Sequence, residues 1–181
     1  MPWCSLLLLF LPISAVHNGN DQPKSYIDWT IARKLTWNDF QAPADNRSGN
    51  AALTNAGITI DFSYHGSELV YSVFCRFDKT KSWVKIKTDY ILGHEQGHFD
   101  IAEIYARKLF KALRAYHPDE KNLSRDINKI YREMMLAFHE EEADYDRETN
   151  FSIEQQQQAA WKKRISDELE SLKDFAEYQS K

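Results

Sequence analysis

The chain has 181 residues and a formal net charge of −4, and aromatic residues make up 13% of it. This length suits one domain with a hydrophobic core, and the aromatic content argues against a disordered chain. Basic residues are scattered along an acidic sequence, which argues against a nucleic acid as partner.

An apolar run at residues 5–16 (SLLLLFLPISAV) lies close to the N-terminus. It is too short to span a bilayer and is typical of a secretory signal peptide, although no Lys or Arg precedes it. We therefore expect residues 1–16 to be a signal peptide, a secreted or periplasmic location, and no stable membrane insertion after cleavage. The alternative is a buried N-terminal element. Cys4 would leave with the signal peptide, so only Cys75 would remain and no internal disulfide could form.

Strands are predicted from residue 26 to about residue 86, where apolar and polar residues alternate. The first is expected at residues 26–31 (YIDWTI). Residues 51–64 (AALTNAGITIDFSY) and 68–77 (ELVYSVFCRF) flank a short Gly-containing turn and predict an antiparallel hairpin. A further short strand is expected at residues 83–86.

An edge strand beside an active-site cleft can pair with an extended peptide. Residues 70–77 or 58–62 would then form the ledge on which a substrate lies. The alternative is a half-buried sheet with no role in binding.

A predicted helix at residues 88–113 carries the motif HEQGH at residues 94–98. Thr88 or Asp89 is a favourable N-cap, and the helix should stop before Pro118. An apolar stripe runs along the helix and includes both histidine positions, so the two imidazoles should face the interior. The stripe consists of Ile91, Ile101, Ala102, Tyr105, Leu109, Ala112 and Leu113.

His94 and His98 are four residues apart, so on a helix they project from one face and can hold one metal ion together. Glu95 lies one step round the helix, where a carboxylate can deprotonate a metal-bound water. This pattern is typical of a zinc hydrolase with a third protein ligand and an open position. The alternative is a pair of core histidines satisfied by hydrogen bonds. Gly97 indicates that something approaches the helix closely, since Gly costs about 1 kcal/mol in a helix interior.

A second helix is predicted at residues 122–149, and the short turn before it favours antiparallel packing of the two helices. At about 1.5 Å per residue, it returns to the level of the histidines near residues 139–146, where we expect the third ligand. Its apolar stripe consists of Leu123, Ile127, Ile130, Tyr131, Met134, Phe138 and Tyr145.

Two carboxylates in this stretch lie toward the buried side of the second helix. Glu142 is nearest to the apolar face, and a buried carboxylate needs a partner such as a metal. Asp146 follows four residues later and can either bind the metal or accept a hydrogen bond from a liganding histidine. We therefore expect the third ligand to be Glu142 or Asp146. The alternative, a solvated acidic face, is what we expect for Glu140 and Asp144.

Residues 151–181 are predicted to contain a third amphipathic helix that packs over the first two as a structural cap. The glutamine tract that ends at Gln158 is expected on its surface. Its apolar residues at helical spacing are Trp161, Ile165, Leu169, Leu172 and Phe175.

Four segments carry a resemblance to a known family: LTWNDF (35–40), TNAGI (54–58), HEQGHFDIAE (94–103) and YDRET (145–149). With them the chain resembles a mostly bacterial family of predicted secreted zinc-dependent proteases, DUF922. The resemblance implies a zincin-like metallopeptidase with His94 and His98 as ligands, Glu95 as base and Asp146 within a second functional motif. It also implies a His two residues after Thr149, where this chain has Phe151. A His that serves the metal or the transition state would then be missing.

These observations predict an α+β fold: a small antiparallel sheet followed by three helices, zincin-like, with HExxH on the first long helix. Residues 17–150 would form the metallopeptidase domain, and residues 151–181 the helix packed on it. We expect Zn²⁺ as cofactor and a peptide or protein as substrate. A zinc-activated water would attack the peptide bond with Glu95 as general base, and Tyr145 or Tyr105 would stabilise the oxyanion.

Two other classes of protein fit the same residues. A secreted metal-binding domain without catalytic activity would bind a partner through the same cleft, and Phe151 favours this class. A structural helical domain would hold the histidine pair in its core without metal. No sequence feature indicates a particular substrate or oligomeric state.

Overall fold

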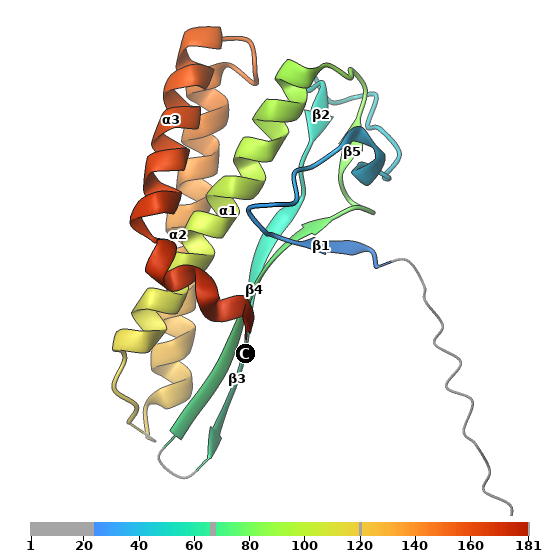
Figure 1. The fold of residues 1–181 in the computed structure, drawn as a ribbon. Coiled ribbons are helices and arrows are strands. Elements are labelled where there is room, and N and C mark those ends of the chain that lie inside the picture. Colours follow the sequence, from blue (N-terminus) through green and yellow to red (C-terminus); the bar gives the residue numbers. More distant parts are fainter. Residues whose placement is uncertain (1–23, 66–67, 120, 181) are drawn as a thin grey trace, which may run out of the picture.

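The computed structural model describes residues 24–65, 68–119 and 121–180. The predicted α+β class is confirmed, because a small antiparallel sheet is followed by three long helices (Figure 1). In chain order the elements are β1 (Tyr26–Asp28), the 3-10 helix η1 (Trp37–Asp39), β2 (Ala52–Leu53), β3 (Ala56–His65), β4 (Glu68–Asp78), β5 (Trp83–Val84), α1 (Asp89–Ala115), α2 (Leu123–Thr149), α3 (Gln155–Ser171) and the 3-10 helix η2 (Lys173–Ser180).

The strands form two antiparallel sheets. β3 and β4 make the predicted hairpin, in register from Ala56 opposite Phe77 to His65 opposite Glu68. β1 adds to the other edge of β4, which gives the order β1-β4-β3. The strand predicted at residues 51–64 is divided, because β2 leaves the hairpin and pairs with β5 instead. This break brings the chain at β2 into contact with α1.

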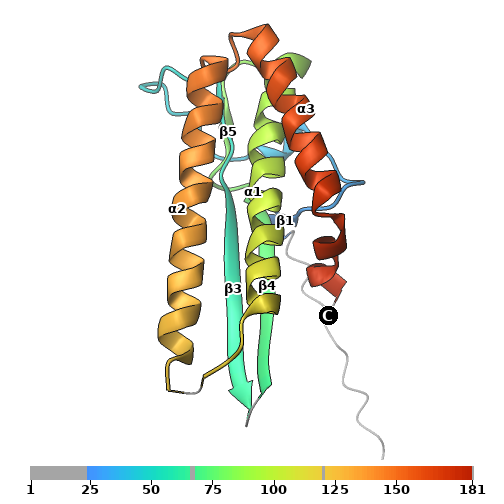
Figure 2. The same ribbon diagram turned by 90° about the vertical axis from the view of Figure 1, so that its left-hand side faces the viewer.

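The helices form a layer against one face of the β3–β4 hairpin, with α1 in the middle between α2 and α3 (Figure 2). α1 and α2 run antiparallel, as the short turn between them predicts. Thr88 is the N-cap of α1, since its hydroxyl oxygen accepts a hydrogen bond from the backbone N–H of Ile91. The buried apolar residues of α1 are Phe99, Ile101, Ala102, Ile104, Tyr105, Ala106, Leu109, Phe110 and Leu113.

Polar residues of α1 fix the N-terminal part of the chain. The side-chain oxygen of Gln96 accepts a hydrogen bond from the backbone N–H of Leu35 at 2.8 Å. Asp100 accepts one from the indole N–H of Trp29 at 2.7 Å and another from the Gln96 amide at 2.7 Å. The motif helix is thus held on one side by the segment that precedes the hairpin.

The third helix is shorter than its apolar pattern predicts. α3 ends at Ser171, and the chain continues as η2, whose Tyr178 donates a hydrogen bond to the buried carboxylate of Glu103 on α1. Arg107 donates a second hydrogen bond to Glu103, at 2.8 Å. A change from α-helical to 3-10 geometry therefore accompanies the anchoring of the C-terminal segment on α1.

Within residues 24–65, 68–119 and 121–180, no helix is both long and apolar enough to cross a bilayer. The predicted signal peptide at residues 1–16 lies outside the described residues and stays a prediction.

Candidate metal centre

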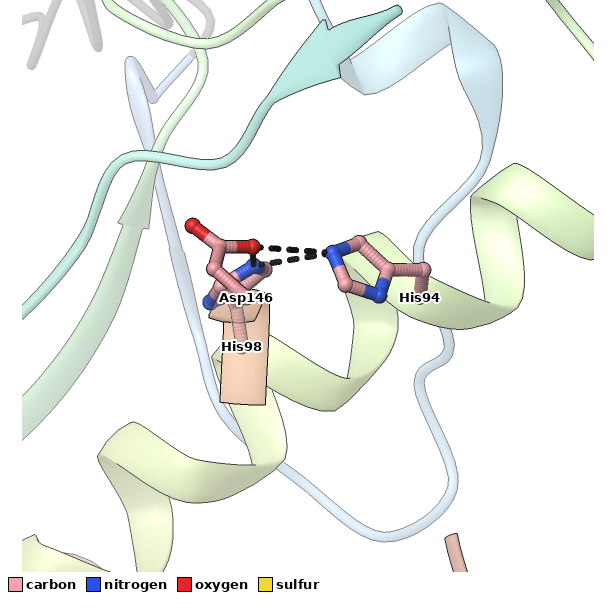
Figure 3. Close-up of side chains that lie close together, drawn as sticks. All are labelled: His94, His98 and Asp146. Atoms are coloured by element: carbon pink, nitrogen blue, oxygen red, sulfur yellow. Dashed lines mark hydrogen bonds and ion pairs between the residues drawn. The ribbon is translucent and has the colours of Figure 1, made fainter. Parts of the chain in front are cut away.

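Three potential metal ligands point toward one another where α2 passes the first half of α1 (Figure 3). Oδ1 of Asp146 lies 3.1 Å from Nε2 of His94 and 3.1 Å from Nε2 of His98. The two Nε2 atoms are 3.3 Å apart. In the described part of the chain, this is the one group of three His, Cys, Asp or Glu side chains whose ligand atoms lie so close together.

The spacing of these atoms suits a zinc ion. Tetrahedral zinc with bonds of about 2.0–2.1 Å places neighbouring ligand atoms about 3.3–3.4 Å apart. All three observed separations lie close to that value. Two imidazoles and one carboxylate are also a donor set of catalytic zinc sites, in which a fourth position stays open for water or substrate. His94, His98 and Asp146 therefore suit zinc as its three protein ligands.

Glu142, the other candidate ligand, contacts His98 on the opposite edge of the ring. Its Oε1 lies 3.1 Å from Nδ1 of His98. Because an ionised carboxylate only accepts hydrogen bonds, Nδ1 must donate, and this directs Nε2 toward Asp146. Of the two carboxylates that the sequence left open, Asp146 is the one grouped with both Nε2 atoms, and Glu142 contacts the opposite nitrogen of His98.

Gln158 of α3 contacts Nδ1 of His94 in the way that Glu142 contacts Nδ1 of His98. Its Oε1 lies 2.8 Å from Nδ1 of His94, and its amide donates to the hydroxyl of Tyr145 at 2.5 Å. That hydroxyl donates to the backbone oxygen of His94 at 3.2 Å. Since the hydroxyl has given its proton to a carbonyl, it must accept from Gln158, which fixes the amide orientation and leaves Oε1 to accept from Nδ1. The expected surface position of Gln158 is wrong, because its side chain is buried.

Tyr145 contacts the ring of His94 and is not part of the pocket lining. The two rings stack with a centroid distance of 4.5 Å. A Cβ atom on Gly97 would lie 2.8 Å from Cζ of Tyr145, which explains why the helix has Gly here. The contacts of Tyr145 in the structure are therefore with His94, Gln158 and the backbone at Gly97, and its oxyanion contact stays a prediction. Tyr105, the other candidate, donates to Glu141 at 2.9 Å.

Glu95 shares the pocket with the three ligands and is held by the chain between β2 and β3. The hydroxyl of Thr54 donates to Oε2 of Glu95 at 2.7 Å. No hydrogen bond to Oε1 occurs within the described residues, and Glu95 lines the pocket. One oxygen of the general-base candidate is therefore fixed, and the other remains available to a water.

The pocket around these residues has a volume of about 180 Å³. The residues that line it come from α1, from α2, from the segment of residues 50–54, and from the turn at Phe151 and Ser152. The substrate ledges expected at residues 58–62 and 70–77 do not line it. The strand beside the site is β2, which the sequence pattern had merged with the hairpin.

Two carboxylates control the protonation of His98. Burial lowers the pKa of His98, but hydrogen bonds and charge from Asp146 and Glu142 outweigh it and raise the pKa to about 10. Burial acts to raise the pKa of Asp146, but its hydrogen bonds to His94 and His98 hold it below the ordinary value. In the metal-free protein at neutral pH, a proton on His98 therefore sits between two negative charges.

Zinc affinity should depend steeply on pH, because a histidine must lose its proton to bind a metal. With the pKa of His98 near 10, we expect the apparent affinity to rise about tenfold per pH unit from about pH 6.5 to 8.5. Competition with a chelator of known affinity at each pH measures this. An affinity that levels off above pH 6.5 would contradict the raised pKa.

In the metal-free protein the same proton on His98 stabilises the fold fully below pH 6.5, and this contribution to stability is lost as the pH rises toward 10.

A comparison with known protein families shows to which family the chain belongs. Residues 15–153 match a family described as a bacterial protein of unknown function, DUF922. The chain belongs to this family. No curated protein and no solved structure matches the chain. The DUF922 match contains His94, Glu95, His98, Glu142 and Asp146 but ends before Gln158.

Proposed function

We propose that this DUF922 protein is a secreted zinc-dependent metallopeptidase. One observation carries the proposal: three ligand atoms at the spacing of a zinc site share a pocket with the carboxylate of Glu95. Hydrolysis at a zinc site needs these parts, namely a metal with an open position and a base beside it.

The strand β2 supports a peptide as substrate. Among the described strands, β2 pairs with β5 alone, so its other edge has no strand partner. Residues 50–54 line the pocket. An open strand edge offers backbone N–H and C=O groups to an extended peptide whatever its sequence.

In the proposed mechanism, zinc bound by His94, His98 and Asp146 would activate a water and polarise the scissile carbonyl. Glu95 takes a proton from the water while the oxygen of that water forms a bond to the carbonyl carbon. As the C–N bond breaks, Glu95 returns that proton to the leaving nitrogen, and a carboxylic acid and an amine result. Thr54 holds the carboxylate in one orientation for both transfers.

Metal removal tests the proposal. We expect about one zinc per chain, hydrolysis of unfolded casein, and loss of this activity after dialysis against 1,10-phenanthroline with recovery when zinc is added. Elemental analysis measures the zinc content, and a gel-based assay measures casein hydrolysis before and after metal removal. A folded chain that takes up no zinc from a supplemented buffer would contradict the proposal, and so would a zinc-loaded chain that leaves casein intact.

A second candidate function is a metal-binding domain without catalysis. The observation in its favour is Phe151, which lines the pocket at the position where the family resemblance implies His. This candidate gives the same zinc content but no hydrolysis, so the casein assay separates the two.

A further inference from the structure

The turn that follows α2 has an unfavourable backbone conformation. Asn150, Phe151 and Ser152 have φ angles of 48°, 51° and 71°. Left-handed geometry is unfavourable for residues other than glycine, and a bulky residue such as Phe is a clear exception there. Backbone strain of this kind occurs preferentially where a site needs a side chain in a particular place.

Backbone hydrogen bonds hold this turn on the last residues of α2. The N–H of Phe151 donates to the carbonyl oxygen of Asp146 at 2.9 Å. The N–H groups of Ile153 and Glu154 both donate to the carbonyl oxygen of Thr149, at 2.9 and 2.8 Å. The position of Phe151 is therefore coupled to the backbone of a candidate metal ligand.

Two residues of the turn line the metal pocket. Phe151 lines the pocket and is 50% exposed. Ser152 also lines the pocket, is only 8% exposed, and its hydroxyl has no hydrogen-bond partner within the described residues. One apolar and one polar residue of the turn thus contribute to the surface of the pocket.

We propose that Phe151 forms the apolar wall of a substrate subsite, so that the protein cleaves peptides with a large apolar or aromatic side chain next to the scissile bond. This inference rests on the proposed peptidase function. The ring carries no charge and no hydrogen-bond donor, and its large apolar surface favours contact with an apolar or aromatic side chain. Ala51 and Leu53 also line the pocket and add apolar surface, and Glu142 would repel an acidic side chain.

Mapping of cleavage sites gives the first test. Zinc-loaded protein is incubated with unfolded casein, and the peptides produced are sequenced by mass spectrometry. We expect Phe, Leu, Tyr or Met to be enriched at one position adjoining the cleaved bonds. Two fluorogenic peptides that differ only at this position, Phe against Ser, then give a ratio of kcat/KM. For the wild type we expect a ratio of about ten or more, the range of discrimination by an apolar contact.

Three variants assign the preference to the ring. Phe151→Asn removes the ring but keeps the turn, because Asn enters left-handed conformations readily, and should bring the ratio close to one with little change in Tm. Phe151→Tyr retains the ring and should retain the ratio. Asn150→Gly changes the same strained turn at a residue outside the pocket lining and should also leave the ratio unchanged.

The outcomes separate the two proposals. A zinc-loaded wild type that cleaves casein without apolar enrichment would overturn the subsite, and so would a ratio that survives in Phe151→Asn. In both cases the peptidase function would stand. A zinc-loaded wild type that does not cleave casein would overturn the proposed function and the subsite with it.

Discussion

Replacement of Glu95 by Gln should lower kcat for peptide hydrolysis by about 10²–10⁴-fold, the usual contribution of a general base, and should leave the zinc content unchanged. The substitution keeps the shape of the side chain and an oxygen that can accept from Thr54, but removes the basic carboxylate. Casein hydrolysis and elemental analysis on the same preparation measure both quantities.

The matched control is Glu140→Gln, which makes the same chemical change at an exposed residue of α2 outside the pocket. We expect it to retain full activity. Equal activity in wild type and Glu95→Gln would contradict the assignment of Glu95 as base. Loss of zinc together with activity would instead mean that Glu95 maintains the metal site.

The helices were predictable because their signals are long and periodic. The stripe in α1 and the N-cap Thr88 gave that helix its start and its buried face, and the spacing of His94 and His98 gave the metal hypothesis. The split between β2 and β3 was not predictable from alternation. Apolar and polar residues alternate regularly only from Ile58 to Tyr64, whereas residues 51–57 show no regular pattern. The tertiary pairing of β2 with β5 divides the segment.

The burial of Gln158 was predictable from its helical spacing to the apolar residues of α3, although its glutamine tract indicated a surface position. It lies three residues before Trp161 and seven before Ile165, so it continues the buried stripe of α3. A polar residue at such a position needs a buried partner, and here the partners are His94 and Tyr145. The three preceding glutamines are exposed, which made the whole tract look like surface.

The choice between Glu142 and Asp146 could not be made from helical angles. Because α1 and α2 are antiparallel, Glu142 lies beside His98 and Asp146 beside His94. The ring of His98 spans the distance between the two carboxylates, with Nδ1 on Glu142 and Nε2 on Asp146. The position of each carboxylate along the axis of α2 determines which of them reaches both Nε2 atoms. Helical angles describe only the direction around the axis of one helix and do not give this position.

This arrangement predicts a graded loss of zinc affinity. Asp146→Asn should weaken zinc binding by about 10²-fold or more, since structural zinc sites with four ligands bind with about 10–16 kcal/mol, or roughly 3 kcal/mol per ligand. Glu142→Gln and Gln158→Leu should each weaken it by about tenfold, because they remove groups that only orient a liganding histidine. Chelator competition at constant pH measures all three, with Gln157→Leu on the exposed face of α3 as control.

The relative size of these losses of zinc affinity shows which side chain is the third ligand. If Glu142→Gln weakened zinc binding more than Asp146→Asn, Glu142 would be the ligand, and the contact of Asp146 with both imidazoles would belong to the metal-free protein alone. If Gln158→Leu matched Gln157→Leu, then α3 would be the structural cap that its apolar stripe suggests. A tenfold effect confined to Gln158 would instead show that this helix, which follows the matched family region, belongs to the metal centre.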